Sequence, residues 1–247
     1  MPDSITLNSM MSNYFEPQPG LRLHRLRGWL GHCHVLEDVA RREAVLIDTG
    51  LVGELGRLEA TLARAGLGWR DVRAILLTHG HLDHTGNLAA IRRRSGAPVF
   101  AHPAEQAHID GRYPYRGPAR VCGAMESVGR AILRYRGVAI DVPLAPGERL
   151  PFWGGLEVVH LPGHTEGHCG FYSAACDLLF TGDLFACYGF STHLAPPFLN
   201  SCPEKLPESL RRVRALAPRY LVPNHYDCAD HVRHRAMFDA LVKREGI

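Results

Sequence analysis

The sequence has no apolar run that approaches the roughly 18 to 20 residues of a membrane-spanning helix. Its N-terminus begins Met1, Pro2 and Asp3 and lacks the charged and then apolar pattern of a secretory signal. Neither sign of charge dominates, with 28 Lys and Arg against 25 Asp and Glu spread along the chain. These absences favour a soluble cytoplasmic protein without a membrane or nucleic-acid partner, and they leave a small molecule as the expected substrate.

The number and spacing of the cysteines do not indicate a disulfide-bonded protein. The seven cysteines are odd in number, and none of them forms a C-x-x-C pair. A chain of 247 residues buries enough apolar surface to be stable without disulfides, so reduced thiols are expected. No repeat or linker divides the chain, and we therefore predict a single α/β domain over residues 1–247.

Short apolar runs that end in polar loops recur along the chain. They predict strands at 21–27, 32–37, 44–47, 74–77, 98–101, 156–160, 171–173, 178–181 and 221–223. Helical spacing of apolar residues predicts helices over 55–65, 87–94 and 121–135. Many polar candidate residues follow the predicted strands directly, which is where open sheets place their ligands.

Two segments are less regular. Residues 110–140 are predicted to form an insertion or lid that borders the site, in which Tyr113, Tyr115 and Arg116 serve either as a lid or as a dimer contact. The stretch 184–203 is rich in aromatic residues and proline and is predicted to shape a substrate pocket. Ordinary packing accounts for such aromatic residues about as well. The pocket residues that we predict from their closeness in sequence to the site are Phe185, Tyr188, Phe190, His193 and Tyr226.

Histidine is the residue that the sequence has in unusual number, 15 in all. Four side chains able to bind a metal follow one predicted strand within six residues: His79, His81, Asp83 and His84. Imidazole nitrogen and carboxylate oxygen suit zinc, iron or manganese better than calcium. Without an ion, such a cluster beside a buried strand would bring desolvated polar groups together with nothing to pair them. The cluster therefore predicts a transition-metal site.

Three further candidate ligands follow later strands, namely His164, Asp183 and His225. Seven ligands exceed what one tetrahedral ion uses, so we predict two divalent transition-metal ions, with zinc favoured and iron or manganese as alternatives. Two ions that share one water need a bridging carboxylate, and Asp183 is the natural bridge. Asp48, at the end of a strand, is a candidate hydrogen-bond partner for a ligand histidine, although a plain turn role fits it equally well.

These residues stand in a set of motifs: Leu46-Ile-Asp-Thr-Gly50, Leu77-Thr-His-Gly-His-Leu-Asp-His-Thr-Gly86, Pro162-Gly-His-Thr-x-Gly-His168, Phe180-Thr-Gly-Asp183 and Pro223-x-His225. In this combination the sequence resembles the metallo-β-lactamase-fold superfamily of metallohydrolases. The resemblance implies a four-layer αββα sandwich with the metals at the rim between two sheets. It also implies a first metal on His79, His81 and His164, a second on Asp83, His84 and His225, and a bridge at Asp183.

Comparison with the subfamilies of that superfamily narrows the choice of substrate. Asp183 resembles the bridging residue of glyoxalase II, lactonase and phosphodiesterase sites, whereas true β-lactamases lack a bridging aspartate there. A penicillin-type substrate is therefore not expected. The run 184–190 differs from the glycine-, cysteine- and arginine-containing run of glyoxalase II and persulfide dioxygenases.

The function predicted from these residues is a dinuclear metal-dependent hydrolase. A metal-bridging hydroxide would cleave an ester, lactone, thioester or related bond in a small molecule, with Asp83 and Asp183 as the catalytic carboxylates that orient it. The same ligands leave open a phosphodiesterase, a di-iron redox or gas-sensing protein, and an inactive metal-filled binding module. A homodimer is also left open.

Overall fold

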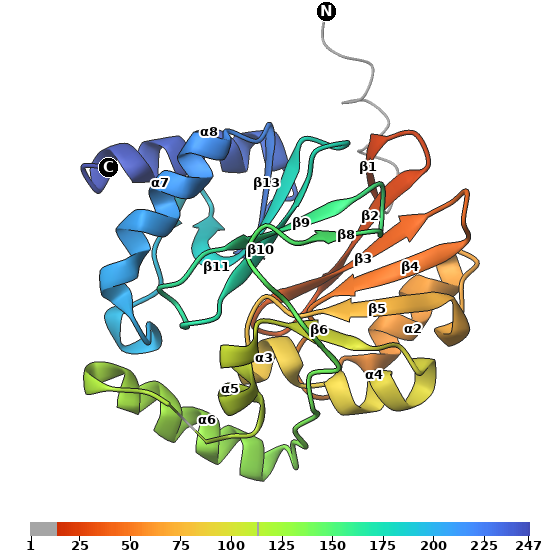
Figure 1. Ribbon diagram of the computed structural model, residues 1–247, viewed down its shortest axis with the longest axis horizontal. Coiled ribbons are helices and arrows are strands. Elements are labelled where there is room, and N and C mark those ends of the chain that lie inside the picture. Colours follow the sequence, from red (N-terminus) through yellow and green to blue (C-terminus); the bar gives the residue numbers. More distant parts are fainter. Residues whose placement is uncertain (1–13, 113) are drawn as a thin grey trace, which may run out of the picture.

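Two β-sheets pack face to face in the computed structural model, which describes residues 14–112 and 114–247 (Figure 1). The strands of the first sheet lie in chain order, antiparallel from β1 to β4 and parallel from β4 to β7. They are β1 (Phe15–Gln18), β2 (Leu21–Arg27), β3 (His32–Asp38), β4 (Glu43–Ile47), β5 (Val72–Leu76), β6 (Val99–Ala101) and β7 (Val142–Pro143).

The second sheet has the order β12-β11-β10-β9-β8, and β13 pairs with β11 in parallel. Its strands are β8 (Arg149–Leu150), β9 (Leu156–His160), β10 (Cys169–Ser173), β11 (Leu178–Tyr188), β12 (Ser191–His193) and β13 (Tyr220–Tyr226). Because β11 lies between β10 and β13, its residues are well placed to reach the edge where the two sheets meet.

Helices cover the outer faces of both sheets (Figure 1). Helices α2 (Leu55–Arg64) and α4 (Leu88–Ser95) contribute to one apolar cluster with the first sheet, and α7 (Leu206–Leu216) and α8 (His231–Arg244) contribute to another with the second. The remaining α-helices are α3 (Leu82–Thr85), α5 (Gln106–Ile109) and α6 (Arg120–Ile132). The predicted αββα arrangement is therefore confirmed.

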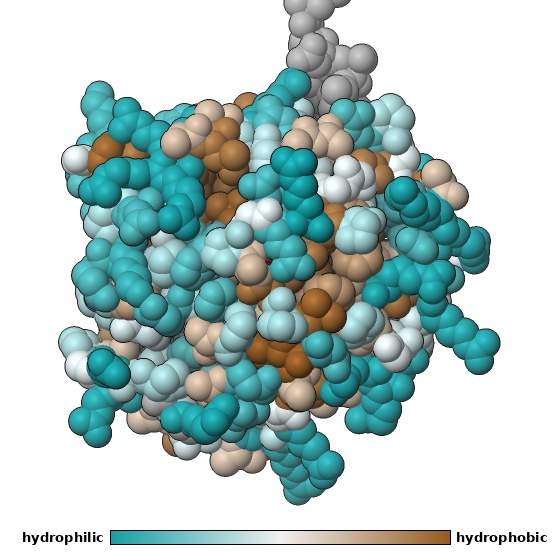
Figure 2. Space-filling view, in the orientation of Figure 1, coloured by the Kyte–Doolittle hydropathy of each residue, from teal (hydrophilic) through white to brown (hydrophobic). Residues whose placement is uncertain are grey.

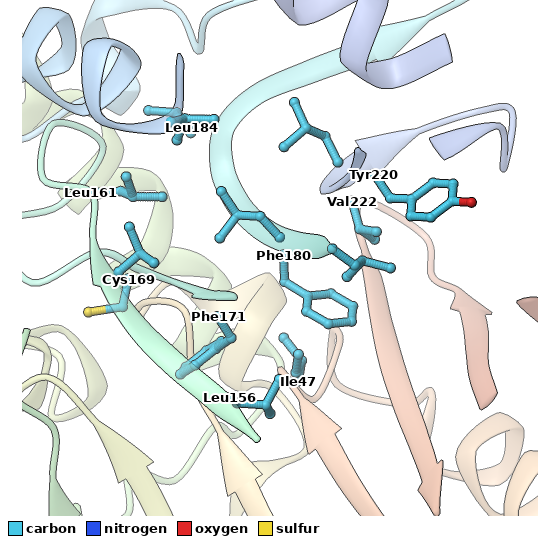
Figure 3. Close-up of a cluster of buried hydrophobic side chains, with 14 of the residues drawn as sticks. Ile47, Leu156, Leu161, Cys169, Phe171, Phe180, Leu184, Tyr220 and Val222 are labelled. Atoms are coloured by element: carbon cyan, nitrogen blue, oxygen red, sulfur yellow. The ribbon is translucent and has the colours of Figure 1, made fainter. Parts of the chain in front are cut away.

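The side chains of β4 show how one strand serves two layers. Val45 and Ile47 join the cluster between the sheets, while Ala44 and Leu46 join the cluster beneath α2 and α4. This alternation follows from the two-residue repeat of a strand. Figure 3 shows Ile47 close to Leu156 and Phe180 in the cluster between the sheets, which fixes the two sheets against each other.

All nine predicted strands are present, but two of them continue well past their predicted ends. Strand β11 continues to Tyr188 and β13 to Tyr226, so Asp183 and His225 lie within strands and not after them. The pairing of β11 with β13 shifts register on both sides of Gly182, whose φ is +54°. Such an irregularity interrupts the apolar pattern while the strand goes on.

The prediction that 184–203 is irregular is therefore wrong for its first part, which contains the end of β11 and the whole of β12. Helices α7 and α8 were not predicted. Tyr113 lies outside the described residues. No helix in the described part of the chain combines the length and the apolar character needed to cross a membrane. Figure 2 shows polar side chains over most of one face, with apolar ones gathered in smaller patches.

Candidate metal centre

The first four predicted ligands lie in the loop that follows β5 and in the short helix α3. His79, His81 and His84 are buried, and His81 precedes α3 in an extended conformation. Gly80 lets this loop approach α5, because a Cβ atom there would lie 2.6 Å from the Cβ of His108. The glycine between the two histidines is therefore a requirement of close packing as well as of the motif.

Two clusters of ligand atoms form at the edge between the sheets. The first joins His79, His81 and His164, whose ligand atoms lie within 4.8 Å of one another. The second joins Asp83, His84 and His225 within the same limit. In the second cluster, Asp83 Oδ2 lies 3.6 Å from His84 Nε2 and 3.7 Å from His225 Nε2. The structure thus gathers the two predicted sets from segments far apart in the sequence.

Asp183 lies between the two clusters. Its Oδ1 is 3.3 Å from His84 Nε2, and its Oδ2 is 3.6 Å from His164 Nε2 and 3.0 Å from His225 Nε2. The backbone N–H of Asp183 donates to His168 Nε2 at 3.0 Å, while His168 Nδ1 donates to the carbonyl of Leu161 at 2.9 Å. His168 is therefore a buried support for Asp183.

The residues present fit a pair of metal ions. The Nε2 atoms of His79 and His84 and the Oδ1 atom of Asp183 are buried and have no hydrogen-bond partner among the described residues. Unpaired buried polar atoms are costly, and a cation that accepts their lone pairs removes that cost. Nitrogen and carboxylate oxygen together are the donor set of a divalent transition metal.

Electrostatics favour the same conclusion. Burial lowers the pKa values of His79 and His81 well below their ordinary value, which leaves both rings neutral and able to ligate. Burial also acts to lower the pKa of His84, but the carboxylates of Asp183, Asp83 and Asp48 overcome it and raise this pKa. The negative charge that favours a proton there also favours a divalent cation.

Asp48 supports the second cluster from behind. His84 Nδ1 donates to Asp48 Oδ2 at 2.9 Å, and Thr78 donates to the same carboxylate from its backbone N–H at 2.8 Å and from its hydroxyl at 2.7 Å. Asn224 Nδ2 donates to Asp48 Oδ2 at 2.5 Å. This arrangement fixes the tautomer of His84 and directs its Nε2 lone pair into the site, as a carboxylate behind a ligand histidine does.

The sequence did not predict three residues that hydrogen-bond to the ligand histidines or to the loops that carry them. His164 Nδ1 lies 3.0 Å from Asn200 Oδ1, and His79 Nδ1 lies 3.0 Å from the hydroxyl of Thr78. Glu105 accepts from the backbone N–H of Gly80 at 2.7 Å and from that of Gly167 at 2.9 Å, and so ties together the two loops that carry the first cluster. Thr78 adjoins the metal motif, but no sequence pattern marks Asn200 or Glu105.

The segment 110–140 borders the centre through α6. Glu126 accepts from the backbone N–H of Leu82 and from the hydroxyl of Tyr115, both at 2.7 Å. Arg130 donates to the carbonyl of Gly80 at 3.0 Å and to that of Ile109 at 2.9 Å. Side chains of the inserted segment therefore hold the backbone on both sides of His81.

Of the five predicted pocket residues, some are exposed in the structure and others are buried. Tyr188 is about half exposed, and its hydroxyl lies 3.4 Å from His225 Nδ1. Phe190 is exposed beside Arg233, and His193 is exposed on β12. Phe185 and Tyr226 are corrections, because both side chains are buried in the core. Phe185 packs against Phe238 and Tyr226 against His234, and both of these partners belong to α8.

Comparisons with known proteins agree with this fold and site. A family model described as Metallo-beta-lactamase superfamily matches residues 26–225. Hydroxyacylglutathione hydrolase of Pseudomonas paraeruginosa (strain DSM 24068 / PA7) is 32% identical over 184 residues, which cover 74% of this chain and 56% of that protein. The chain spans little more than half the length of the curated relatives that it matches.

Two solved structures are similar over most of the chain. A metallo-beta-lactamase family protein from Thermus thermophilus has a TM-score of 0.70 at 27% identity, covering 93% of this chain and 80% of the other. The protein TTHA1623, solved in a di-iron-bound form, has a TM-score of 0.61 at 30% identity, covering 82% of this chain and 91% of the other.

Proposed function

The chain belongs to the metallo-beta-lactamase superfamily, and from this premise we propose that it is a metal-dependent hydrolase with a dinuclear centre. The observation that carries the proposal is the place of Asp183, whose two oxygens face His84 on one side and His164 and His225 on the other. A carboxylate in that position is what two neighbouring ions require.

The proposed ligand sets follow the two clusters. His79, His81 and His164 would hold one ion, Asp83, His84 and His225 the other, and Asp183 both. When bound, a pair of divalent ions supplies a Lewis acid for a carbonyl or phosphoryl oxygen and lowers the pKa of water towards about 7. We assign zinc to the centre because the site combines five histidines with two carboxylates.

The protein side chains supply orientation and proton transfer. The carboxylates of Asp83 and Asp183 lie at the centre of the ligand set, where they orient the attacking water and accept its proton. Asp48 holds the ring of His84 in one tautomer, and Asn200 does so for His164. These supports keep the rings in place during turnover.

The proposed substrate is a small molecule with an ester, lactone or thioester bond. The similarity to a hydroxyacylglutathione hydrolase supports the thioester, although that relative extends well beyond the matched region. A cytoplasmic location is also proposed, because all seven cysteines are free and six of them are buried.

The test combines metal analysis with a substrate panel. Protein purified without added metal is analysed by elemental mass spectrometry and then incubated with a lactone, a thioester, a phosphodiester and a β-lactam. Two zinc ions per chain with turnover of the thioester or lactone is the expected result. Turnover of the phosphodiester alone would replace the substrate class.

The second candidate function is a di-iron redox or sensing role, and the metal analysis distinguishes it from the hydrolase. TTHA1623 was solved in a di-iron-bound form, so a redox or sensing role on the same ligands has a specific precedent among similar structures. Two irons per chain, an oxygen-dependent iron absorption band and no hydrolysis of any panel member would overturn the hydrolase proposal in favour of that role.

A further inference from the structure

Two arginines of the inserted segment face a cavity and have no acidic partner among the described residues. Arg116 and Arg120 line a cavity of about 550 Å³ together with Tyr115, Gly117 and Gly123. Arg112, a few residues earlier, differs in that it pairs with Asp110 at 2.8 Å. Leaving two neighbouring guanidinium groups unpaired on one wall concentrates positive charge in the cavity.

The cavity adjoins the metal centre through one side chain. Tyr115 lines the cavity, and its ring centroid lies 5.9 Å from that of His81 and 5.0 Å from that of His108. The hydroxyl of Tyr115 is held by Glu126, so the ring is a fixed partition between the arginines and the first ligand cluster. The cavity and the first ligand cluster thus lie against the same tyrosine ring.

The shape of the cavity suits a small anionic group. Gly117 and Gly123 put no side chains into it, and the hydroxyl of Ser127 adds a hydrogen-bond donor to its wall. Guanidinium groups are planar, stay charged and present paired donors that match the oxygens of carboxylate or phosphate. A neutral or cationic substrate would make no comparable use of these two side chains.

We propose that Arg116 and Arg120 bind an anionic oxygen group, carboxylate or phosphate, on the leaving portion of the substrate. The inference rests on the proposed hydrolase function and deepens it, because it selects substrates by charge at a point remote from the bond that is cleaved. Water is consumed in that reaction, and an acid and a thiol or alcohol are released.

The test uses three acetyl thioesters that differ only in the leaving thiol. The thiols are 3-mercaptopropionate, its methyl ester and 2-mercaptoethyl phosphate. Arg116→Ala and Arg120→Ala are each expected to raise KM for the two anionic thioesters about tenfold, with kcat and the neutral thioester little changed. The anion whose KM rises more identifies carboxylate or phosphate as the preferred group.

Arg136→Ala is the matched control, since it removes one exposed positive charge from the same segment. If Arg136→Ala raises KM as much as the other two variants, general electrostatic attraction accounts for the effect and the proposal is overturned. Equal KM changes for the anionic and neutral thioesters would overturn it as well.

A binding measurement separates this inference from the proposed function. The probe is the thioether analogue of the anionic thioester, in which a CH₂ group separates sulfur from the carbonyl so that the bond to be cleaved is absent. Calorimetric titration of the wild type and of the Arg116→Ala/Arg120→Ala double variant is expected to show binding that the double variant loses. Equal binding, or no binding to the wild type, overturns the anion site whether or not any thioester is hydrolysed.

Discussion

The metal centre and the segment 110–140, which the sequence predicted to be an insertion, lie against each other but are built in different ways. Ligands of the centre come from strands, loops and the short helix α3, and four of the seven side chains are buried while the other three are partly buried. Helix α6 of the inserted segment lies at the periphery of the molecule (Figure 1), and it exposes four apolar side chains: Val121, Met125, Val128 and Ile132.

The two regions also differ in the contacts that hold them in place. Behind the ligands, His84 and Asp183 have the buried partners Asp48 and His168. The inserted segment is joined to the centre mainly by polar side chains, Glu126 and Arg130, that bind its backbone. The centre is thus held by buried contacts within the sandwich, whereas the adjoining segment is attached to it through a few polar side chains.

Removing the bridge gives the largest expected effect on the centre. Asp183→Ala deletes the carboxylate that faces His164 of the first cluster and His84 and His225 of the second, so metal content falls and turnover drops by more than the ~10–100-fold typical of a lost partner behind a ligand. Elemental analysis and steady-state kinetics measure both. A variant that keeps two ions and full activity would contradict the dinuclear assignment.

Asp48→Asn probes the support behind a ligand. Asn tolerates the φ of +60° at this position, so the backbone is preserved while His84 Nδ1 loses its carboxylate acceptor. Metal affinity is expected to fall by ~10–100-fold in a chelator competition assay. Asp38→Asn, which changes a carboxylate bonded to Arg41 away from the centre, is the control and should leave affinity unchanged.

Glu105 gives the centre a pH dependence of stability. Burial raises the pKa of Glu105 from 4.5 to about 7. A folded-state pKa above the unfolded one means that the folded protein holds the proton longer, so the stability from this group is complete below pH ~4.5 and is lost as the pH rises to ~7. The loss amounts to up to ~3 kcal/mol.

Denaturant unfolding of the wild type and of Glu105→Gln at pH 4.5, 6 and 8 measures this loss, because glutamine does not titrate. The free energy of unfolding of the wild type relative to the variant should fall across the window. A difference that is the same at all three pH values would show that folding leaves the pKa of Glu105 unshifted.

Glu126→Ala tests the junction between the two regions. It leaves the N–H of Leu82 and the hydroxyl of Tyr115 without their buried acceptor, and we expect the free energy of unfolding to fall by ~1–3 kcal/mol. Met125→Ala, which changes an exposed neighbour on α6, should have little effect. If both variants are equally stable, the junction contributes nothing and the inserted segment folds independently of it.

His193→Ala is expected to have the smallest effect. The side chain is exposed on β12, so metal content should stay at the wild-type level and stability should change by less than ~0.5 kcal/mol. Loss of metal by elemental analysis would mean that His193 replaces one of the seven assigned ligands.

The sequence alone indicated an α/β domain and seven candidate ligands, and its motifs resembled a superfamily whose fold is the αββα sandwich. The cluster from His79 to His84 was the clearest signal, because histidine and aspartate packed so densely after an apolar strand would be costly to bury without a metal ion. It also marked Asp48, which stands at a strand end. These inferences depend on local order along the chain, and local order is what a sequence displays directly.

Only the tertiary structure showed which residues hydrogen-bond to the site and which side chains lie next to it. Asn200, Glu105 and Glu126 reach the centre from 36, 25 and 44 residues away from the groups that they bind. Phe185 and Tyr226 were assigned to the pocket because they are near ligands in sequence, but both side chains pack in the core against α8. Closeness along the chain does not specify which face of a strand a side chain occupies, or which distant segment packs against it.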